Sequence, residues 1–177
     1  MDKPASDLAF RFMSLGFRFR DFRLRRMEIL KEVGIQAGFM VLDFGCGAGS
    51  YVAATSRLVG QSGKVYALDI HPLAVRNVAN IVSKKGLTNV ETVLSDCSTG
   101  LPDESIDAVL LYDTFHGLSQ PAKVLRELHR VLRPEGILSF SDHHLKEAEI
   151  SARVAEGGLF KLEGKGRRTY RFSRVKR

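Results

Sequence analysis

Three glycines at alternate positions, Gly45, Gly47 and Gly49, follow an apolar run that carries Asp43. A helix-like segment over residues 51–59 comes directly after them. This order predicts a buried strand, a tight glycine loop and the N-terminus of a helix. Glycine lets the backbone adopt positive φ and approach a ligand closely, and the free N–H groups of a helix start favour a polar or anionic ligand group. The stretch therefore predicts a nucleotide-like cofactor site.

The spacing of these glycines differs from the dinucleotide fingerprint. The pattern G-x-G-x-x-G requires glycine at position 50, where this chain has Ser50, and its third glycine comes one residue early, at Gly49. The difference disfavours a nicotinamide-dependent oxidoreductase. A glycine-rich turn with a purely structural role stays open at this point.

The chain has the size and composition of one globular domain, with 177 residues, 44% hydrophobic and 27% charged. No apolar stretch approaches the ~20 residues that cross a bilayer, and arginines interrupt the region where a signal peptide needs an apolar core. The two cysteines, Cys46 and Cys97, match neither a disulfide framework nor a zinc spacing. We therefore expect a reducing, cytoplasmic setting.

Positive charge is concentrated at the C-terminus. Residues 161–177 contain eight lysines and arginines and one acidic residue, so this segment alone matches the formal net charge of +7. Such a segment can attract nucleic acid or acidic substrates. A solvated terminal strand and tail is the simpler interpretation, and we favour it.

Residues 1–38 are expected to form an N-terminal helical leader ahead of the main domain, residues 39–177. Phenylalanines alternate with arginines in the leader, at Phe10, Phe12, Phe17, Phe19 and Phe22. The plain interpretation is an amphipathic segment that packs its aromatic side chains on the sheet. A lid over the active site is the main alternative, and a membrane-surface helix or a platform for single-stranded nucleic acid are others.

Strand and helix patterns alternate after the glycine loop. Strands are expected over residues 64–68, 90–94, 106–111 and 137–141, helices over 72–85, 121–132 and 146–156, and a hairpin over 159–162 and 169–172. This alternation predicts an α/β fold with a doubly wound, mostly parallel sheet, and the hairpin adds one antiparallel strand near the C-terminus.

Acidic residues follow the expected strands, at Asp43, Asp69, Asp96, Asp113 and Asp142. In doubly wound sheets, ligands bind beyond the carboxyl ends of the strands. One aspartate in such a turn means little, but a row along one edge of the sheet predicts a polar site.

On these residues the chain resembles the class I S-adenosylmethionine-dependent methyltransferases of the small-molecule type, related to the ubiquinone/menaquinone methyltransferases. The resemblance covers residues 41–140, and residues 124–136 match the family's helix, turn and fifth strand. It implies a Rossmann-like methyltransferase fold with a seven-stranded sheet. It also implies S-adenosylmethionine as cofactor, S-adenosylhomocysteine as product and a small-molecule methyl acceptor.

The resemblance assigns the methionine part of the cofactor to the glycine loop. In the family, backbone groups of this loop and the acidic end of the preceding strand hold the amino and carboxyl groups. The residues that match these roles are Asp43, Gly45, Cys46, Gly47 and Gly49.

The nucleoside is implied to lie against the following strands. Asp69 matches the carboxylate that accepts from both ribose hydroxyls, and Ile70 is expected to pack on the adenine. Asp96 matches the acceptor for the adenine amino group, with the backbone N–H of Cys97 donating to the ring. Tyr112 is expected to form a wall beside the cofactor.

Methyl transfer from a sulfonium depends mainly on aligning a nucleophile behind the methyl carbon. A general base is required only if the acceptor arrives protonated. The catalytic candidates are His116, Asp113 and His143, after the fourth and fifth strands. His116 is the strongest single candidate, because an imidazole has a suitable pKa for base catalysis near neutral pH.

Asp142, His143 and His144, together with His116, also have the ligand chemistry of a zinc or iron site. Neighbouring residues in a strand point to opposite faces, and no known ligand spacing is matched. We therefore expect no metal, and interpret Asp142 as a helix cap followed by two loop histidines.

Two further function classes stay open. The chain lacks the long insertion after the fifth strand from which many relatives build a substrate cap, so a non-catalytic or partner-activated cofactor-binding subunit, or a homodimer that closes the site, is an alternative. An RNA-directed methyltransferase that uses the basic C-terminus is another. Residues 112–115 lack the Asn/Asp-Pro-Pro-aromatic signature of amino-nitrogen base methylation, so nucleic acid is the less favoured partner.

Overall fold

A mixed sheet with strand order β3-β2-β1-β4-β5-β7-β6 forms the centre of the computed structural model, which describes residues 4, 6–12 and 26–175. The strands are β1 (Met40–Phe44), β2 (Lys64–Asp69), β3 (Val90–Leu94), β4 (Ile106–Tyr112), β5 (Leu132–Ser141), β6 (Phe160–Lys165) and β7 (Tyr170–Arg174). Strands β1 to β5 pair in parallel, and β7 is antiparallel to both of its neighbours. The predicted α/β fold with one antiparallel strand near the C-terminus is confirmed.

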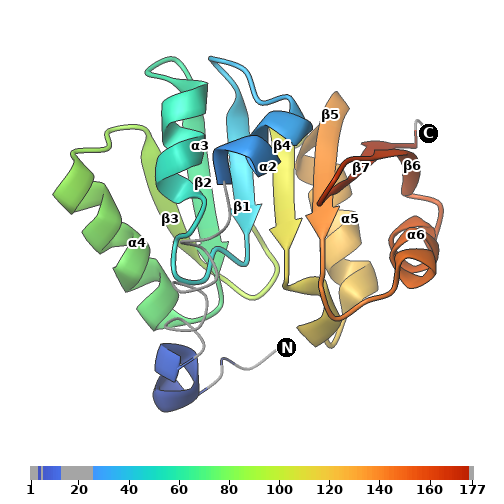
Figure 1. Ribbon diagram of the computed structural model, residues 1–177, viewed down its shortest axis with the longest axis horizontal. Helices are drawn as coiled ribbons and strands as arrows, with labels where there is room; N and C mark the ends of the chain where they lie inside the picture. Colours follow the sequence, from blue (N-terminus) through green and yellow to red (C-terminus); the bar gives the residue numbers. More distant parts are fainter. Residues whose placement is uncertain (1–3, 5, 13–25, 176–177) are drawn as a thin grey trace.

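Helices cover both faces of this sheet (Figure 1). They are α2 (Arg26–Val33), α3 (Val52–Val59), α4 (Pro72–Lys85), α5 (Pro121–Val131) and α6 (Glu147–Ala155), with a short 3-10 turn η1 (Phe115–Gly117). Strand β1 shows how the two faces are built, because Val41 packs in the cluster that includes α2 and its neighbour Leu42 packs in the cluster that includes α5. Alternate residues of a buried parallel strand thus pack into the cores on opposite faces of the sheet.

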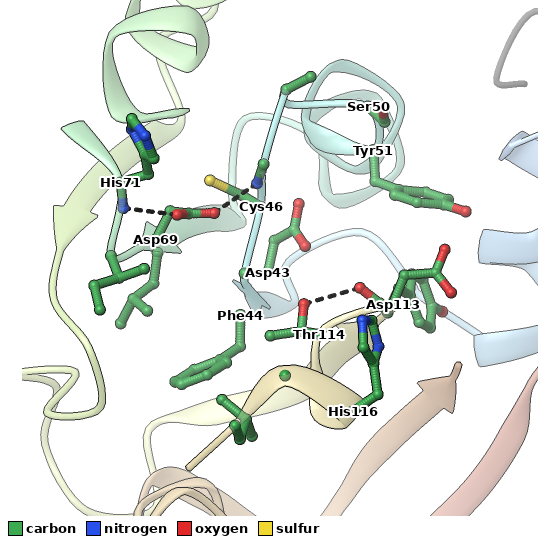
Figure 2. A pocket seen from close by; sticks show the side chains of 18 of the residues that line it. Asp43, Phe44, Cys46, Ser50, Tyr51, Asp69, His71, Asp113, Thr114 and His116 are labelled. Atoms are coloured by element: carbon green, nitrogen blue, oxygen red, sulfur yellow. Dashed lines mark hydrogen bonds between the residues drawn. The ribbon is translucent and has the colours of Figure 1, made fainter. Parts of the chain in front are cut away.

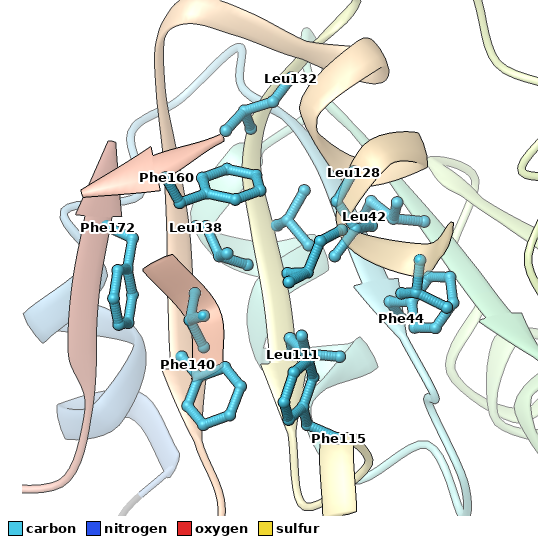
Figure 3. Close-up of a cluster of buried hydrophobic side chains, with 14 of the residues drawn as sticks. Leu42, Phe44, Leu111, Phe115, Leu128, Leu132, Leu138, Phe140, Phe160 and Phe172 are labelled. Atoms are coloured by element: carbon cyan, nitrogen blue, oxygen red, sulfur yellow. The ribbon is translucent and has the colours of Figure 1, made fainter. Parts of the chain in front are cut away.

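The larger core lies between the sheet and helices α5 and α6 (Figure 3). Phenylalanines supply much of its volume, and Phe115, Phe140, Phe160 and Phe172 are almost fully buried. Phe115 belongs to η1, directly before His116. Its ring packs edge-on against Phe140, with 5.3 Å between the ring centres. The core therefore anchors the turn that carries a candidate catalytic histidine.

Strand β5 differs from the sequence prediction. It begins at Leu132 instead of residue 137, and helix α5 ends one residue earlier than predicted, at Val131. Leu132 pairs with Ile106 in the β4–β5 ladder, and the register shifts before the next pair. Pro134 lies in this irregular part of the strand and is exposed. Proline is tolerated in strands at such irregular positions, so the ladder resumes beyond it.

The N-terminal region contributes to the main core. Helix α2 buries Ile29, Leu30 and Val33 in the same cluster as Val41 of β1. The separate leader over residues 1–38 stays a prediction, and Phe17, Phe19 and Phe22 lie outside the described residues. No helix in the described part of the chain has the length and apolar character to cross a membrane.

Candidate active site

The glycine loop after β1 turns under the carboxyl end of the sheet. The backbone N–H groups of Gly45 and Cys46 both donate to the carbonyl oxygen of Leu68, over 2.8 and 2.9 Å. All three loop glycines have positive φ, at 79° for Gly45, 52° for Gly47 and 78° for Gly49. A Cβ atom on Gly45 would lie 2.3 Å from the hydroxyl oxygen of Thr114. Gly45 is thus required both by its backbone conformation and by the closeness of the β4 end.

A cavity of about 540 Å³ opens above this loop, beyond the carboxyl ends of β1, β2 and β4. Its size is in the range of small-molecule and cofactor sites. Most of the predicted site residues line it: Asp43, Gly45, Cys46, Gly47, Asp69, Ile70, Asp96, Tyr112, Asp113, His116 and His143. Four of the five strand-end aspartates thus meet at this cavity, and Asp142 lies outside its lining.

Two of the predicted cofactor residues, Gly49 and Cys97, lie outside the cavity lining. The backbone N–H of Gly49 donates to the carbonyl oxygen of Cys46 over 2.9 Å, and a Cβ atom on Gly49 would meet Ile81 at 2.8 Å. Gly49 therefore lets the loop pack against α4. The backbone N–H of Cys97 donates to the Ser95 hydroxyl over 3.3 Å instead of facing the cavity.

Asp69 ends β2 with its carboxylate held from two sides (Figure 2). The backbone N–H groups of Gly47 and His71 donate to its two oxygens, each over 2.8 Å. A carboxylate has about four acceptor positions, so Asp69 keeps acceptor capacity for a ligand in the cavity that it lines. Burial raises the pKa of this carboxyl above its ordinary value, while the two backbone donors act in the opposite direction.

Asp43 lies at the centre of the cavity wall (Figure 2). The residue is 3% exposed, and its Oδ2 is buried without a hydrogen-bond partner among the described residues. Burial, with a smaller contribution from the nearby Asp69 charge, raises the pKa of Asp43 to about 7. A buried carboxylate oxygen without a donor is costly. A cationic ligand group in the cavity would satisfy it.

His116 faces the cavity from the opposite side to Asp69 (Figure 2). Its ring Nδ1 lies 3.0 Å from both carboxylate oxygens of Asp142, and its backbone N–H donates to Oδ2 of the same carboxylate over 3.0 Å. The side chain of Asp142 is fully buried. This fixed carboxylate therefore sets the position of the imidazole.

A second histidine and carboxylate pair lies beside the first. Nδ1 of His143 is 2.7 Å from Oδ1 of Asp113, and the backbone N–H of His143 donates to the same oxygen over 3.1 Å. The ring of His144 lies between the two pairs, with ring centres 4.0 Å from His116 and 3.9 Å from His143. The expectation that neighbouring histidines point apart is wrong here, because His143 and His144 follow the end of β5 at Ser141.

Tyr112 forms a buried wall of the cavity. Its hydroxyl forms a 2.7 Å hydrogen bond with the Ser139 hydroxyl, and its ring packs edge-on against Tyr51 at 5.0 Å. Burial raises the pKa of the Tyr112 phenol well above its ordinary value. It therefore stays neutral and is suited to packing instead of base catalysis.

Several residues that line the cavity were not predicted from the sequence. The clearest is His71, whose ring stacks on Phe10 with 4.3 Å between the ring centres. His71 also accepts a hydrogen bond from the backbone N–H of Leu73 and caps α4. Its position directly before Pro72, the first residue of the helix, is a signal that could have identified the cap. The packing of Phe10 on it has no signal in the local sequence.

The sequence is similar to methyltransferases over most of its length. Residues 35–165 match the model of a family described as methyltransferase domain. The chain is 34% identical over 140 residues to a ubiquinone/menaquinone biosynthesis C-methyltransferase of Hahella chejuensis, covering 76% of this chain and 55% of that protein. It is 31% identical over 126 residues to a demethylmenaquinone methyltransferase of Geobacillus stearothermophilus, covering 71% of this chain and 54% of that protein.

Among solved structures, a SAM-dependent methyltransferase from Aquifex aeolicus is similar over nearly the whole chain. The TM-score is 0.82 at 28% identity, covering 98% of this chain and 100% of that one. In contrast, the chain spans about half the length of the curated relatives that it matches.

Proposed function

Since the chain belongs to the S-adenosylmethionine-dependent methyltransferase family, we propose that it transfers the cofactor's methyl group to a small-molecule acceptor by in-line displacement. The observation that carries this proposal is the cavity itself. One side presents the buried Oδ2 of Asp43, which has no hydrogen-bond partner within the described part of the chain, and the other presents two histidines held by carboxylates. The similar demethylmenaquinone methyltransferase and ubiquinone/menaquinone biosynthesis C-methyltransferase, both named for small molecules, support the choice of acceptor class.

The residues of the cavity fit S-adenosylmethionine. We assign the ammonium group to Asp43, because its buried Oδ2 has no other donor among the described residues. The ribose hydroxyls then reach Asp69, with Ile70 and Asp96 along the same wall for the adenine. Backbone groups of Gly45, Cys46 and Gly47 line the floor, while Gly49 supports the loop from outside the cavity.

The bound cofactor supplies a methyl group that is already activated by its sulfonium charge. The protein contributes by holding acceptor and donor in line, an effect worth ~7–11 kcal/mol. His116 can also take a proton from the acceptor. A carboxylate only accepts hydrogen bonds, so the hydrogen bond between His116 and Asp142 requires the imidazole proton on Nδ1. The lone pair of the neutral imidazole is then on Nε2, which can accept a proton from the acceptor. Asp113 orients His143 in the same manner.

Cofactor affinity is expected to depend on pH through Asp43. The pKa of about 7 means that the carboxyl of the free protein is protonated below neutral pH, whereas the cofactor ammonium needs the carboxylate. Binding below pH 7 must therefore release a proton. The affinity for the cofactor falls by up to about tenfold for each pH unit below 7 and is constant above pH 7. Calorimetric titration with S-adenosylhomocysteine between pH 5.5 and 8.5 measures this slope. An Asp43→Asn variant should bind weakly at every pH, and an equal slope in that variant would contradict the assignment.

The acceptor side is tested by single-turnover and steady-state assays with a panel of phenolic, quinol and amine acceptors. With an acceptor that arrives protonated, His116→Ala should lower kcat by about 10²–10⁴-fold, while the dissociation constant for S-adenosylmethionine stays near the wild-type value. Turnover restricted to RNA, or only after addition of a partner protein, would contradict the small-molecule proposal.

The basic C-terminal strands give the RNA alternative little support. Lys161 pairs with Glu163 at 2.9 Å, Arg174 pairs with Glu104 at 3.0 Å, and Lys165 pairs with Glu147. These three of the eight cations in residues 161–177 are paired within the fold, which lowers the free positive charge that the segment offers to RNA.

A further inference from the structure

The acceptor side of the cavity carries more metal-ligating groups than proton transfer to His116 alone would require. Three imidazoles and two carboxylates meet there, from the turns after β4 and β5: Asp113, His116, Asp142, His143 and His144. All except Asp142 line the cavity. Asp142 lies beneath them with a fully buried side chain.

Within this cluster, one ligand atom from each of Asp113, Asp142 and His143 lies within 4.8 Å of the other two. The shortest contact, between Nδ1 of His143 and Oδ1 of Asp113, is 2.7 Å. Two ligands at right angles around an ion with bonds of ~2.1 Å lie about 3 Å apart. To enclose an ion, the His143–Asp113 pair would open slightly and the wider separations within the 4.8 Å group would narrow.

We propose that Asp113, Asp142 and His143 form a site for a divalent first-row transition-metal ion at the acceptor side of the cavity. Two carboxylates and one imidazole suit ions from manganese to zinc. The inference goes beyond the proposed transfer function, since ion binding by this cluster does not depend on the cofactor.

Local geometry supports this choice of ligands. Asp113 has a positive φ of 50°, held by a 2.7 Å hydrogen bond from its backbone N–H to the carbonyl oxygen of Ser141. This backbone conformation is uncommon for a residue other than glycine and often occurs at functional sites. The hydrogen bond between Asp113 and Ser141 joins the end of β4 to the end of β5. The two ligand-bearing turns are therefore held as one unit.

The other two histidines support this unit. The backbone N–H groups of His116 and His144 donate to the two oxygens of Asp142, over 3.0 and 3.1 Å, and fix the carboxylate. The His143 side chain is 54% exposed, whereas Asp113 is 15% and Asp142 0% exposed. An ion can therefore enter from the solvent side and rest on the buried oxygens. Its remaining coordination positions would take oxygen atoms of an acceptor.

The test uses tag-free full-length protein, treated with a chelator and titrated with Co²⁺ alone. Visible absorption of Co²⁺ reports nitrogen and oxygen coordination, and equilibrium dialysis reports the stoichiometry. We expect one equivalent to bind. Asp113→Asn and His143→Ala should each weaken binding by at least about tenfold, the loss seen even for indirect partners of metal ligands. Asparagine tolerates positive φ, so the Asp113→Asn change removes charge without straining the backbone.

His144→Ala is the matched control, because it removes a neighbouring imidazole outside the three-ligand set and should bind Co²⁺ as the wild type does. Absence of saturable binding would overturn the inference. So would binding that survives both ligand substitutions, or an equal loss in His144→Ala, which would indicate capture by exposed imidazoles in general. Titration with S-adenosylhomocysteine in the presence of chelator is run in parallel. Cofactor binding without Co²⁺ binding would reject the metal site and leave the proposed function intact.

Discussion

Replacing Asp69 with alanine will weaken the binding of S-adenosylmethionine by about 10²–10⁴-fold. Two hydrogen bonds from ribose hydroxyls to an ionised carboxylate contribute about 1.5–3 kcal/mol each. Asp69 also holds the glycine loop through the backbone N–H of Gly47 and the start of α4 through that of His71. Loss of the side chain therefore removes the proposed ribose contacts and loosens the glycine loop and the start of α4 that Asp69 holds. Calorimetric titration with S-adenosylmethionine and S-adenosylhomocysteine measures the effect.

Two further variants separate the loss of ligand contacts from the loosening of the loop. Asp69→Asn keeps one acceptor oxygen for the loop and the ligand, so its affinity should lie between those of the wild type and the alanine variant. Asp103→Ala removes a surface carboxylate, paired with Arg130, that does not line the cavity. It should leave affinity unchanged. Wild-type affinity in a folded Asp69→Ala protein would contradict the assigned ribose contact.

Replacing Gly45 with alanine will destabilise the fold, and the neighbouring change Gly47→Ala will do so much less. A methyl group on Gly45 would lie 2.3 Å from the Thr114 hydroxyl oxygen, at a φ of 79°. Backbone strain of about 1–2 kcal/mol and overpacking of about 1–3 kcal/mol add together. In a domain of this size, such a loss lowers the melting temperature by roughly 4–20 °C. Thermal unfolding followed by circular dichroism measures it.

Gly47 provides the contrast within the same loop. Among the residues that the structure describes, a Cβ atom there would have only the Gly45 carbonyl oxygen, at 4.0 Å, as a near neighbour, and Gly47 lines the cavity. Gly47→Ala should therefore lose only about 1–2 kcal/mol, the cost of positive φ, which lowers the melting temperature by roughly 2–8 °C. Its methyl group should still weaken cofactor binding. The reverse order, with the larger stability loss at Gly47, would show that the Thr114 contact does not constrain the loop.

The fold could be predicted where local pattern and tertiary structure agree. The apolar run of β4 and the Pro72 and Gly86 limits of α4 match the structure closely. The start of β5 could not be predicted, because it depends on the pairing of Leu132 with Ile106 across the sheet. A proline two residues later looks like a break in the sequence, and only the partner strand shows that pairing begins before it.

The site was predictable to the extent that strand ends define it. The carboxyl ends of parallel strands share one edge of a sheet, so Asp43, Asp69 and Asp96 could be grouped from spacing alone. The contacts that the turns make could not be predicted from the sequence. The convergence of His143 and His144 results from the end of β5 at Ser141, and the stacking of Phe10 on His71 joins segments that are far apart in the sequence.

The most direct test of the account is a crystal structure of the protein with S-adenosylhomocysteine. We predict the amino group of the ligand within hydrogen-bond distance of Asp43 Oδ2, both ribose hydroxyls at the Asp69 carboxylate, and the sulfur directed toward His116. A ligand bound in the opposite direction, or outside the cavity above Gly45 and Gly47, would contradict the assignment of cofactor and acceptor sides.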